Sequence, residues 1–295
     1  MRWLLAPQRW CEYIQSSVAV VNDRWAIGAA YEAYMGRWSR LLAKRFVDWL
    51  GVDARAHWLD VGCGTGALTA AICELGKPVS VVACDPSGPF VEAASSTLPD
   101  KRVSFELASG DYLPRREGGF DIVVSGLVLN FVADPARTLA AMRQRLGARG
   151  LVAAYVWDYA GGVQFLQHFW DVAVALDPAA AALDEGRRFA AFGRDALAEH
   201  FRAAGLAEVT VEALSMPTVF AGFDDYWEPF LGRTGPAPGY VASLSSEQRE
   251  RLRDALRERL TPDADGRIAL EARAWALRGF GSGEGEAAVG GEGPS

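Results

Sequence analysis

The feature that most constrains this chain is a glycine-rich segment, Leu59–Thr69, with the sequence LDVGCGTGALT. An apolar run precedes it and a helical pattern follows it, the context in which a glycine cluster has structural meaning. Glycines at 62, 64 and 66 let the backbone turn sharply and approach a bound molecule, because no Cβ obstructs it. Free N–H groups at the start of the following helix can bind an anionic group. The segment therefore predicts a strand, a ligand-binding turn and a helix.

The stretch around this turn alternates between short apolar strands and helices. We expect strands at Trp58–Val61, Val79–Cys84, Val103–Leu107, Phe120–Ser125 and Leu151–Trp157, and helices at Gly66–Glu74, Gly88–Thr97 and Asp134–Leu146. Strands and helices alternating in this way predict a parallel sheet with helices on both faces. A helical pattern with aromatic residues precedes them over Asn22–Leu50, and Gly51 is expected to end that helix.

The alternation loosens after Tyr159, where the remaining elements are less regular. We expect helices at Val163–Leu176 and Asp195–Ala204 and strands at Glu208–Leu214 and Arg267–Leu277. The long insertion between those two strands carries Tyr226-Trp227, Gly235–Tyr240 and a charged helix at Ser246–Leu260, and we expect it to form a lid.

These patterns predict one domain over residues 23–280, with a cofactor-binding core at 55–160 and an acceptor and lid region at 160–265. Residues 1–22 carry no motif and remain an unassigned extension. Residues 281–295, rich in Gly and Glu, predict a disordered tail.

Composition restricts the partners of the protein. Its net charge of −7 predicts no binding to nucleic acid, which requires clustered Lys and Arg. No apolar run is long enough for a transmembrane helix, and Pro7 and Arg9 interrupt the apolar start of the chain, so we expect a cytoplasmic protein without a membrane segment. The four cysteines form no CxxC pair and have no His at ligand spacing, which predicts reduced thiols and no metal site.

The ligand of the glycine turn is decided by the acidic residues near it. Gly62, Gly64 and Ala67 also satisfy the dinucleotide signature G-x-G-x-x-G/A, so the glycines alone leave an NAD-dependent oxidoreductase open. Asp60 would repel a pyrophosphate, whereas it suits a cationic amino group. Asp85, at the end of the next strand, is placed to accept ribose hydroxyls in either case. Asp60 therefore favours a cationic ligand over a dinucleotide.

The run Asp60–Gly66 resembles the first motif of class I S-adenosylmethionine-dependent methyltransferases, in the group that includes ubiquinone-biosynthesis-type (type 11-like) enzymes. Val81–Ser87 resembles the second motif, and Phe120–Ser125 the motif of the fourth strand. The resemblance implies a Rossmann-like, seven-stranded, mostly parallel sheet whose last strand is antiparallel. It also implies S-adenosylmethionine as cofactor.

The resemblance assigns cofactor-binding roles to individual residues. The methionine end would lie on Asp60 and the glycine loop, the ribose on Asp85, and backbone near Ser125 would border the cofactor. The predicted cofactor-binding set is Asp60, Gly62, Cys63, Gly64, Thr65, Gly66, Asp85, Pro86, Ser109, Gly110, Asp111 and Ser125. The family usually places an Asp after the third strand to bind adenine. Here an ungapped count gives Ser109 and Gly110, with Asp111 two residues later, so Ser109 and Asp111 are alternatives for this contact.

The acceptor is expected beyond the carboxyl ends of the fourth and fifth strands. The predicted acceptor pocket is lined by Asn130, Trp157, Tyr159 and Trp227, and the predicted cofactor cap consists of Tyr34, Arg37 and Trp38. Asp158 and His168 are weak candidate bases; the alternatives are a helix cap for Asp158 and a surface or core-edge histidine for His168. The helical spacing of the cap residues also fits an amphipathic packing face.

The activity expected from these features is methyl transfer to a small-molecule acceptor by in-line displacement. Because a sulfonium donor is already activated, alignment and exclusion of water are the main tasks of the protein, and no obligatory catalytic residue is expected. A non-catalytic, cofactor-binding regulatory or interaction protein is the alternative, and an NAD-dependent oxidoreductase is a further one.

Overall fold

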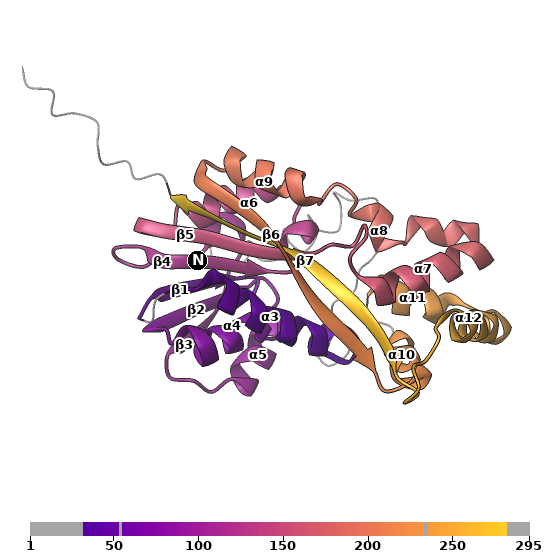
Figure 1. Cartoon of the computed structure of the whole chain (residues 1–295). Helices are drawn as coiled ribbons and strands as arrows, with labels where there is room; N and C mark the ends of the chain where they lie inside the picture. Colours follow the sequence, from indigo (N-terminus) through magenta and orange to yellow (C-terminus); the bar gives the residue numbers. More distant parts are fainter. Residues whose placement is uncertain (1–31, 53–54, 233–234, 282–295) are drawn as a thin grey trace, which may run out of the picture.

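The fold of the chain is a seven-stranded sheet flanked by helices (Figure 1). The computed structural model describes residues 32–52, 55–232 and 235–281. The strands are β1 His57–Val61, β2 Ser80–Asp85, β3 Val103–Leu107, β4 Phe120–Gly126, β5 Leu146–Trp157, β6 Leu206–Phe220 and β7 Ile268–Gly281. Their order is β3-β2-β1-β4-β5-β7-β6, parallel except that β7 runs antiparallel to both β5 and β6. The predicted Rossmann-like, mostly parallel sheet is confirmed.

Helices cover both faces of this sheet. They are α3 Arg37–Leu50, α4 Ala67–Ala71, α5 Gly88–Thr97, α6 Pro135–Arg143, α7 Gln164–Leu176, α8 Glu185–Arg188, α9 Arg194–Ala203, α10 Phe223–Trp227, α11 Pro236–Ser243 and α12 Ser246–Arg259. One apolar core joins α3 and α4 to the sheet, and a second joins α6 and α9 to the opposite face (Figure 1). Because β1 and β4 face helices on both sides, they are buried along nearly their whole length.

The last two strands are longer than the sequence predicts and extend beyond the sheet. β7 pairs with β5 only from Ala274 onward, while its earlier residues pair with β6 out to Phe220. The strand expected from the sequence ends at Leu214, before the stretch that contains Pro217. Pairing with β7 nevertheless continues through this stretch, and the extended hairpin carries α7 and α10–α12 at one end of the molecule (Figure 1).

The insertion expected to form a lid packs on α7. Phe230 stacks on Phe169 at 4.5 Å between ring centroids, and Leu252 and Leu256 of α12 belong to the same buried core. This helix begins with a capping box made by Ser245 and Gln248. The apolar faces of the insertion are thus used for packing.

Several predictions concern the ends of the chain. Gly51 ends α3 in a left-handed conformation, as expected. The predicted extension at 1–22, the tail from residue 282, Tyr31 and Cys11 lie outside the described residues. The described cysteines Cys63, Cys73 and Cys84 are free thiols. In the described part of the chain, no helix combines the length and apolar character needed to cross a membrane.

Candidate functional site

The glycine turn lies where the strand order of the sheet reverses, between β1 and β4. Open α/β sheets bind ligands at this switch point, beyond the carboxyl ends of the strands. The N–H groups of Gly62 and Cys63 both donate to the carbonyl of Cys84, at 2.8 and 3.0 Å. The turn is therefore fixed to the end of β2 before α4 begins.

Two glycines of the turn meet different requirements. A Cβ on Gly62 would lie 2.6 Å from Val128 Cγ2, so this position must lack a side chain to let the loop after β4 approach. Gly64 has a φ of +53° and no described atom within 4 Å of its Cβ position, so its backbone faces open space. Gly66 instead packs against Ala94 of α5. The turn thus offers a bare backbone surface around Gly64.

Asp85 closes the other side of this surface. Its carboxylate accepts the N–H of Gly64 at 3.0 Å and the N–H of Ser87 at 2.8 Å. The side chain is mostly buried, and burial raises the pKa of the carboxyl group above its ordinary value. The hydrogen bond from Gly64 holds the Asp85 carboxylate next to backbone that faces open space. A carboxylate in this position can accept hydrogen bonds from the hydroxyl groups of a ligand.

Asp60 is buried beneath the turn and does not belong to the described cavity lining. Its carboxylate accepts the Thr69 hydroxyl at 2.6 Å, and its second oxygen has no partner among the described residues. Burial, aided by the negative charge of Asp85, raises the pKa of Asp60 to about 7, against the hydrogen bond from Thr69. Direct contact between Asp60 and a cationic amino group stays a prediction. The negative charge of this carboxylate can attract a cationic group in the site, and its unpartnered oxygen can accept a hydrogen bond.

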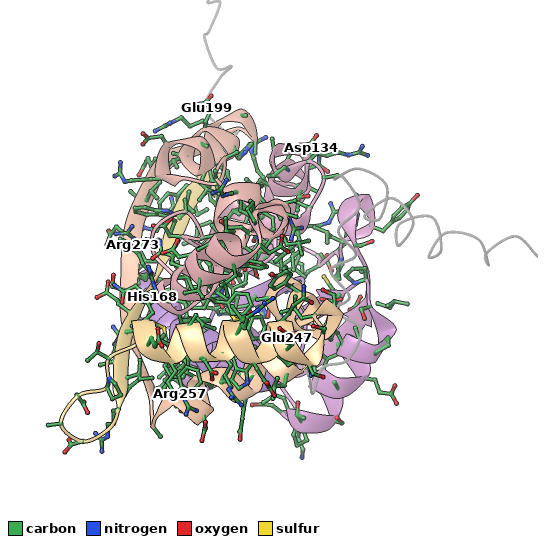
Figure 2. The ribbon with its side chains drawn as sticks, turned by 90° about the vertical axis from the view of Figure 1, so that its right-hand side faces the viewer. Asp134, His168, Glu199, Glu247, Arg257 and Arg273 are labelled. Carbon is green, nitrogen blue, oxygen red and sulfur yellow. The ribbon has the colours of Figure 1, made fainter. Side chains whose placement is uncertain are left out.

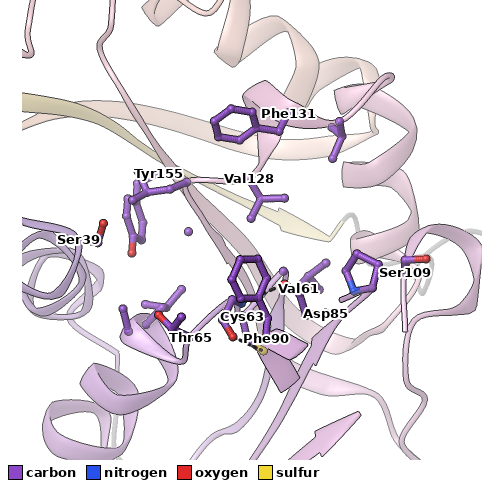
Figure 3. Close-up of a pocket in the computed structure, with 18 of the residues that line it drawn as sticks. Ser39, Val61, Cys63, Thr65, Asp85, Phe90, Ser109, Val128, Phe131 and Tyr155 are labelled. Carbon is purple, nitrogen blue, oxygen red and sulfur yellow. Dashed lines mark hydrogen bonds between the residues drawn. The ribbon is translucent and has the colours of Figure 1, made fainter. Parts of the chain in front are cut away.

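A cavity of about 280 Å³ extends from this turn across the carboxyl ends of the strands (Figure 3). Pro86, Ser109 and Gly110 line one end, beyond β2 and β3. Tyr155, Trp157 and Tyr159 line the other end, at β5. Gly62, Cys63, Gly64, Thr65 and Asp85 lie between them. The cavity is therefore elongated along the sheet edge and has polar groups near β2 and aromatic groups near β5.

The end near β3 bears on the two candidates for an adenine contact. Ser109 and Gly110 both line the cavity, and Figure 3 labels Ser109 at its edge. Asp111 belongs to the short turn Gly110–Tyr112, but its side chain lies outside the described part of the structure.

The loop after β4 forms the roof of the cavity. Ser125 is buried and donates to the Val61 carbonyl at 2.8 Å, so it ties β4 to β1, while Gly126, Leu127 and Val128 line the cavity. Leu127 has a φ of +62°, a strained conformation for a residue with a branched side chain. Its N–H donates to the Tyr155 carbonyl at 2.8 Å.

The N-terminal helical region contributes a different face from the one predicted. Met35 and Ser39 line the cavity, whereas Tyr34, Arg37 and Trp38 do not. Arg37 pairs with Asp225 at 3.0 Å and lies over the ring of Trp38. Arg37 thus fastens this helix to α10, while Tyr34 packs on Phe230 and Trp38 on Phe220. The helical periodicity of these residues reflects packing.

The predicted acceptor residues divide into two groups. Trp157 and Tyr159 line the cavity. Trp227 packs between Phe223 and Phe230 in the α10 region and is corrected to a packing role. Asn130 is buried directly before a cavity residue, and neither polar atom of its amide has a partner in the described structure.

The two candidate bases are both held by arginines and lie outside the described cavity lining. Asp158 accepts two hydrogen bonds from Arg273, at 2.6 and 2.9 Å, instead of capping a helix. His168 accepts a hydrogen bond from Arg259 on Nδ1 at 2.9 Å. Burial and the charge of Arg259 lower the pKa of His168. Neither side chain lines this cavity, and a role as base stays a prediction for both.

The sequence interpretation missed further residues that line the cavity: Met35, Ser39, Phe90, Leu127, Val128, Phe131 and Tyr155. Two signals were available for them. Met35 and Ser39 are one helical turn apart, and Leu127–Phe131 directly follows a predicted strand whose carboxyl end faces the site.

Comparison with known proteins shows what the region that builds this site resembles. Residues 59–154 match a family described as a methyltransferase domain. The match spans β1 to β5 and thus the glycine turn, Asp85 and the roof of the cavity. The recognition of an S-adenosylmethionine-dependent methyltransferase domain of class I is confirmed.

Solved structures of methyltransferases share the fold of this chain. Phosphoethanolamine N-methyltransferase 2 of Haemonchus contortus, in complex with S-adenosyl-L-methionine, superposes with a TM-score of 0.51 at 16% identity, over 94% of this chain and 60% of that one. A Bacillus halodurans protein classed as a methyltransferase gives a TM-score of 0.51 at 12% identity, over 81% of this chain and 98% of that one. These likenesses support the fold.

A curated relative corrects one expectation about partners. The ribosomal RNA small subunit methyltransferase C of Citrobacter koseri is 39% identical over 67 residues, which make up 23% of this chain and 20% of the relative. The match thus spans about a fifth of the length of the relative. The exclusion of nucleic acid, which rested on net charge, was wrong. Net charge describes the whole chain, whereas a nucleic-acid surface needs only a local patch, so the acidic balance could not support that exclusion.

Proposed function

We propose that the chain is an S-adenosylmethionine-dependent methyltransferase. The observation that carries this proposal is the elongated cavity in which the bare backbone at Gly64 lies beside the Asp85 carboxylate. Bound there, S-adenosylmethionine would supply a methyl group on a positively charged sulfur. The rest of the site must hold the cofactor, align the acceptor and exclude water.

The arrangement of the cavity suggests how its residues divide these tasks. Ser109, Gly110 and Pro86 would hold the adenine end, and Asp85 would accept the ribose hydroxyls. The backbone from Gly62 to Thr65, with Met35 and Ser39 opposite, would hold the methionine end. This assignment follows the order in which the strands present these residues along the sheet edge.

The electrostatics favour a cationic ligand over a dinucleotide. Two carboxylates, Asp60 and Asp85, lie next to the glycine turn, and burial raises the pKa of both. A positive charge nearby would stabilise their ionised forms, whereas a pyrophosphate would add repulsion. The unpartnered oxygen of Asp60 is a further polar group that a ligand or an ordered water can satisfy.

The acceptor end favours an apolar or aromatic group. Leu127, Phe131 and Trp157 line this end, and Tyr159 packs against Phe189 at 5.1 Å between ring centroids. We infer that the acceptor atom is carried on a flat or apolar moiety that these rings enclose. Asn130 offers an amide donor and acceptor beside them for a polar atom of that moiety. Because both candidate bases are ion-paired or hydrogen-bonded elsewhere, alignment by these walls would be the main contribution of the chain.

Calorimetry with S-adenosylmethionine and with NADH tests the cofactor. We expect binding of the former, its loss in Asp85→Ala, and no change in Glu106→Ala, which removes an exposed carboxylate from β3. Binding of NADH in place of S-adenosylmethionine would overturn the proposal.

Transfer of a labelled methyl group tests the activity. The protein is incubated with the labelled cofactor and with two fractions of a cell extract, one of small aromatic compounds and one of RNA. Label in either fraction supports methyl transfer and identifies the source of the acceptor moiety. Cofactor binding without label in any fraction would favour the regulatory alternative.

A further inference from the structure

A second cavity, of about 560 Å³, lies between α7, the turn at α8 and the end of α12. Its lining is largely polar and includes Gln167, His168, Asp171, Arg187 and Arg259. We refer to it as the polar cavity. His168 lies beside α12, where Figure 2 labels it. None of the roles assigned above uses this cavity.

The charged groups around the polar cavity are balanced in pairs. Arg259 donates to Asp171 at 2.5 Å, and Arg187 lies 3.4 Å from Asp184. The described lining holds no other Lys, Arg, Asp or Glu. Two guanidinium groups therefore face two carboxylates, and the cavity offers no net charge to a ligand. A charged ligand would find each opposite charge in the lining already paired.

Hydrogen-bonding groups of both kinds remain available in this balanced setting. Because His168 Nδ1 accepts from Arg259, its ring is neutral and carries its proton on Nε2. The Gln167 amide adds a donor and an acceptor, and Asp171 keeps acceptor capacity. Donors and acceptors side by side, with no net charge, match hydroxyl groups, each of which both donates and accepts.

The wall of the polar cavity is held in place by one buried contact and by two contacts near the surface. Trp170, which lines it, donates through its indole N–H to the buried carboxylate of Glu185. Arg259 links α12 to α7 through His168 and Asp171. These contacts fix the polar groups before a ligand arrives, which reduces the entropy cost of binding.

Tyr159 connects the polar cavity to the cofactor cavity. It lines both, at the carboxyl end of β5 where the acceptor is proposed to lie. A molecule whose aromatic part rests against Tyr159 in the cofactor cavity can therefore extend toward the polar cavity, which Tyr159 also lines.

We propose that the polar cavity binds a neutral, hydroxyl-rich group of the acceptor, such as a sugar ring joined to the aromatic moiety. This inference deepens the proposed function, since it names the chemical class of the second half of the acceptor. Its three supports are the balanced charges, the mixed donors and acceptors, and the shared wall at Tyr159.

The test measures binding of aryl probes to the full chain saturated with S-adenosylhomocysteine. The probes are 4-nitrophenyl β-glucoside, 4-nitrophenol and 4-nitrophenyl phosphate, with a short RNA oligonucleotide as a fourth arm. We expect the glucoside to bind about tenfold more tightly than the phenol, as two or so net hydrogen bonds imply. Gln167→Leu and His168→Phe should remove this advantage and leave the affinity for the phenol unchanged. Arg253→Ala, an exposed change on α12, should leave both affinities unchanged.

The outcomes separate this inference from the proposed function. Equal affinity for glucoside and phenol, or tightest binding of the phosphate or the RNA, overturns the hydroxyl-rich assignment while leaving cofactor binding intact. Failure of S-adenosylhomocysteine to bind, measured first by calorimetry, would instead refute the proposed function. Retention of the glucoside advantage in both cavity variants would place the sugar elsewhere and overturn the inference.

Discussion

The hydroxyl of Thr69 donates a 2.6 Å hydrogen bond to the carboxylate of Asp60, and this carboxylate is fully buried beneath the glycine turn. The contact joins the end of β1 to the first turn of α4. It satisfies one oxygen of Asp60 and leaves the other without a partner in the described structure. The ionised form of Asp60 is therefore held in a site that stabilises it poorly until a positive charge arrives.

The first prediction concerns stability against pH without cofactor. Burial raises the pKa of Asp60 from 3.8 to about 7, so the folded state holds a proton that the unfolded state has lost. The contribution of Asp60 to the free energy of unfolding is fully present below pH 3.8, the pKa in the unfolded state. It is lost as pH rises toward about 7, the pKa in the folded state, by about 1.4 kcal/mol per pH unit between these two values. Thermal unfolding of Asp60→Asn should lack this dependence. Glu106→Gln, an exposed change, should retain it, and equal slopes in all three proteins would contradict the assignment.

The second prediction concerns proton release on cofactor binding. A cationic ligand stabilises ionised Asp60 and Asp85, so it should expel about one proton when binding occurs near pH 6. Affinity should therefore rise as pH increases toward 7 and level off above it. Calorimetry in buffers of different ionisation enthalpy measures the proton directly. Proton release that is unchanged in Asp60→Asn would assign it to Asp85 or to the ligand instead.

The third prediction separates the two glycines of the turn. Gly62→Ala should destabilise the fold by about 1–3 kcal/mol, because its Cβ would meet Val128 at 2.6 Å. Trimming the opposing side chain in a Gly62→Ala, Val128→Ala double variant should recover part of this loss.

The Cβ of Gly64→Ala meets no described atom, so this variant should cost only about 1 kcal/mol for its left-handed conformation. Gly64→Val should weaken cofactor binding strongly, since a branched side chain would occupy the exposed backbone surface. Unfolding curves and calorimetry measure both effects.

The fourth prediction distinguishes the two faces of the N-terminal helical region. Arg37→Ala removes an ion pair and a ring contact away from the cavity, so it should cost about 1 kcal/mol of stability and leave cofactor affinity within about twofold. Met35→Ala should weaken cofactor binding, because Met35 lines the cavity. The reverse pattern would restore the predicted cap of Tyr34, Arg37 and Trp38.

The fold could be predicted from the sequence where local signals agreed. The turn at Gly62–Gly66 and the strands on either side combine an apolar run, glycines and a following helix, and these signals belong to residues close together in the chain. The extension of β6 to Phe220 could not be predicted, because it depends on pairing with β7, whose residues come much later. Propensity carries no information about such a distant partner.

The site could be predicted only for residues fixed by the turn itself. Asp85 and the Gly62–Thr65 backbone line the cavity because the strand ends place them there. Arg37, Asp158 and His168 were chosen for chemical character, yet each has an ion-pair or hydrogen-bond partner far away in the sequence: Asp225, Arg273 and Arg259. A sequence shows a reactive side chain, but the partner that pairs with this side chain is known only from the three-dimensional structure.

The last prediction tests whether Asp158 is structural. Its carboxylate is almost fully buried and accepts two hydrogen bonds from Arg273, so Arg273→Ala would leave an unpaired buried charge. We expect a loss of about 2 kcal/mol in unfolding free energy, measured by denaturant titration. Arg273→Ala, Asp158→Ala should be less destabilised than the sum of the two single variants, because removing both partners leaves no orphaned charge. Methyl transfer in Asp158→Asn should keep the pH profile of the unmodified protein. If this variant instead folds with full stability but loses activity, and with it the rise of activity with pH that a general base gives, Asp158 would act in the reaction after all.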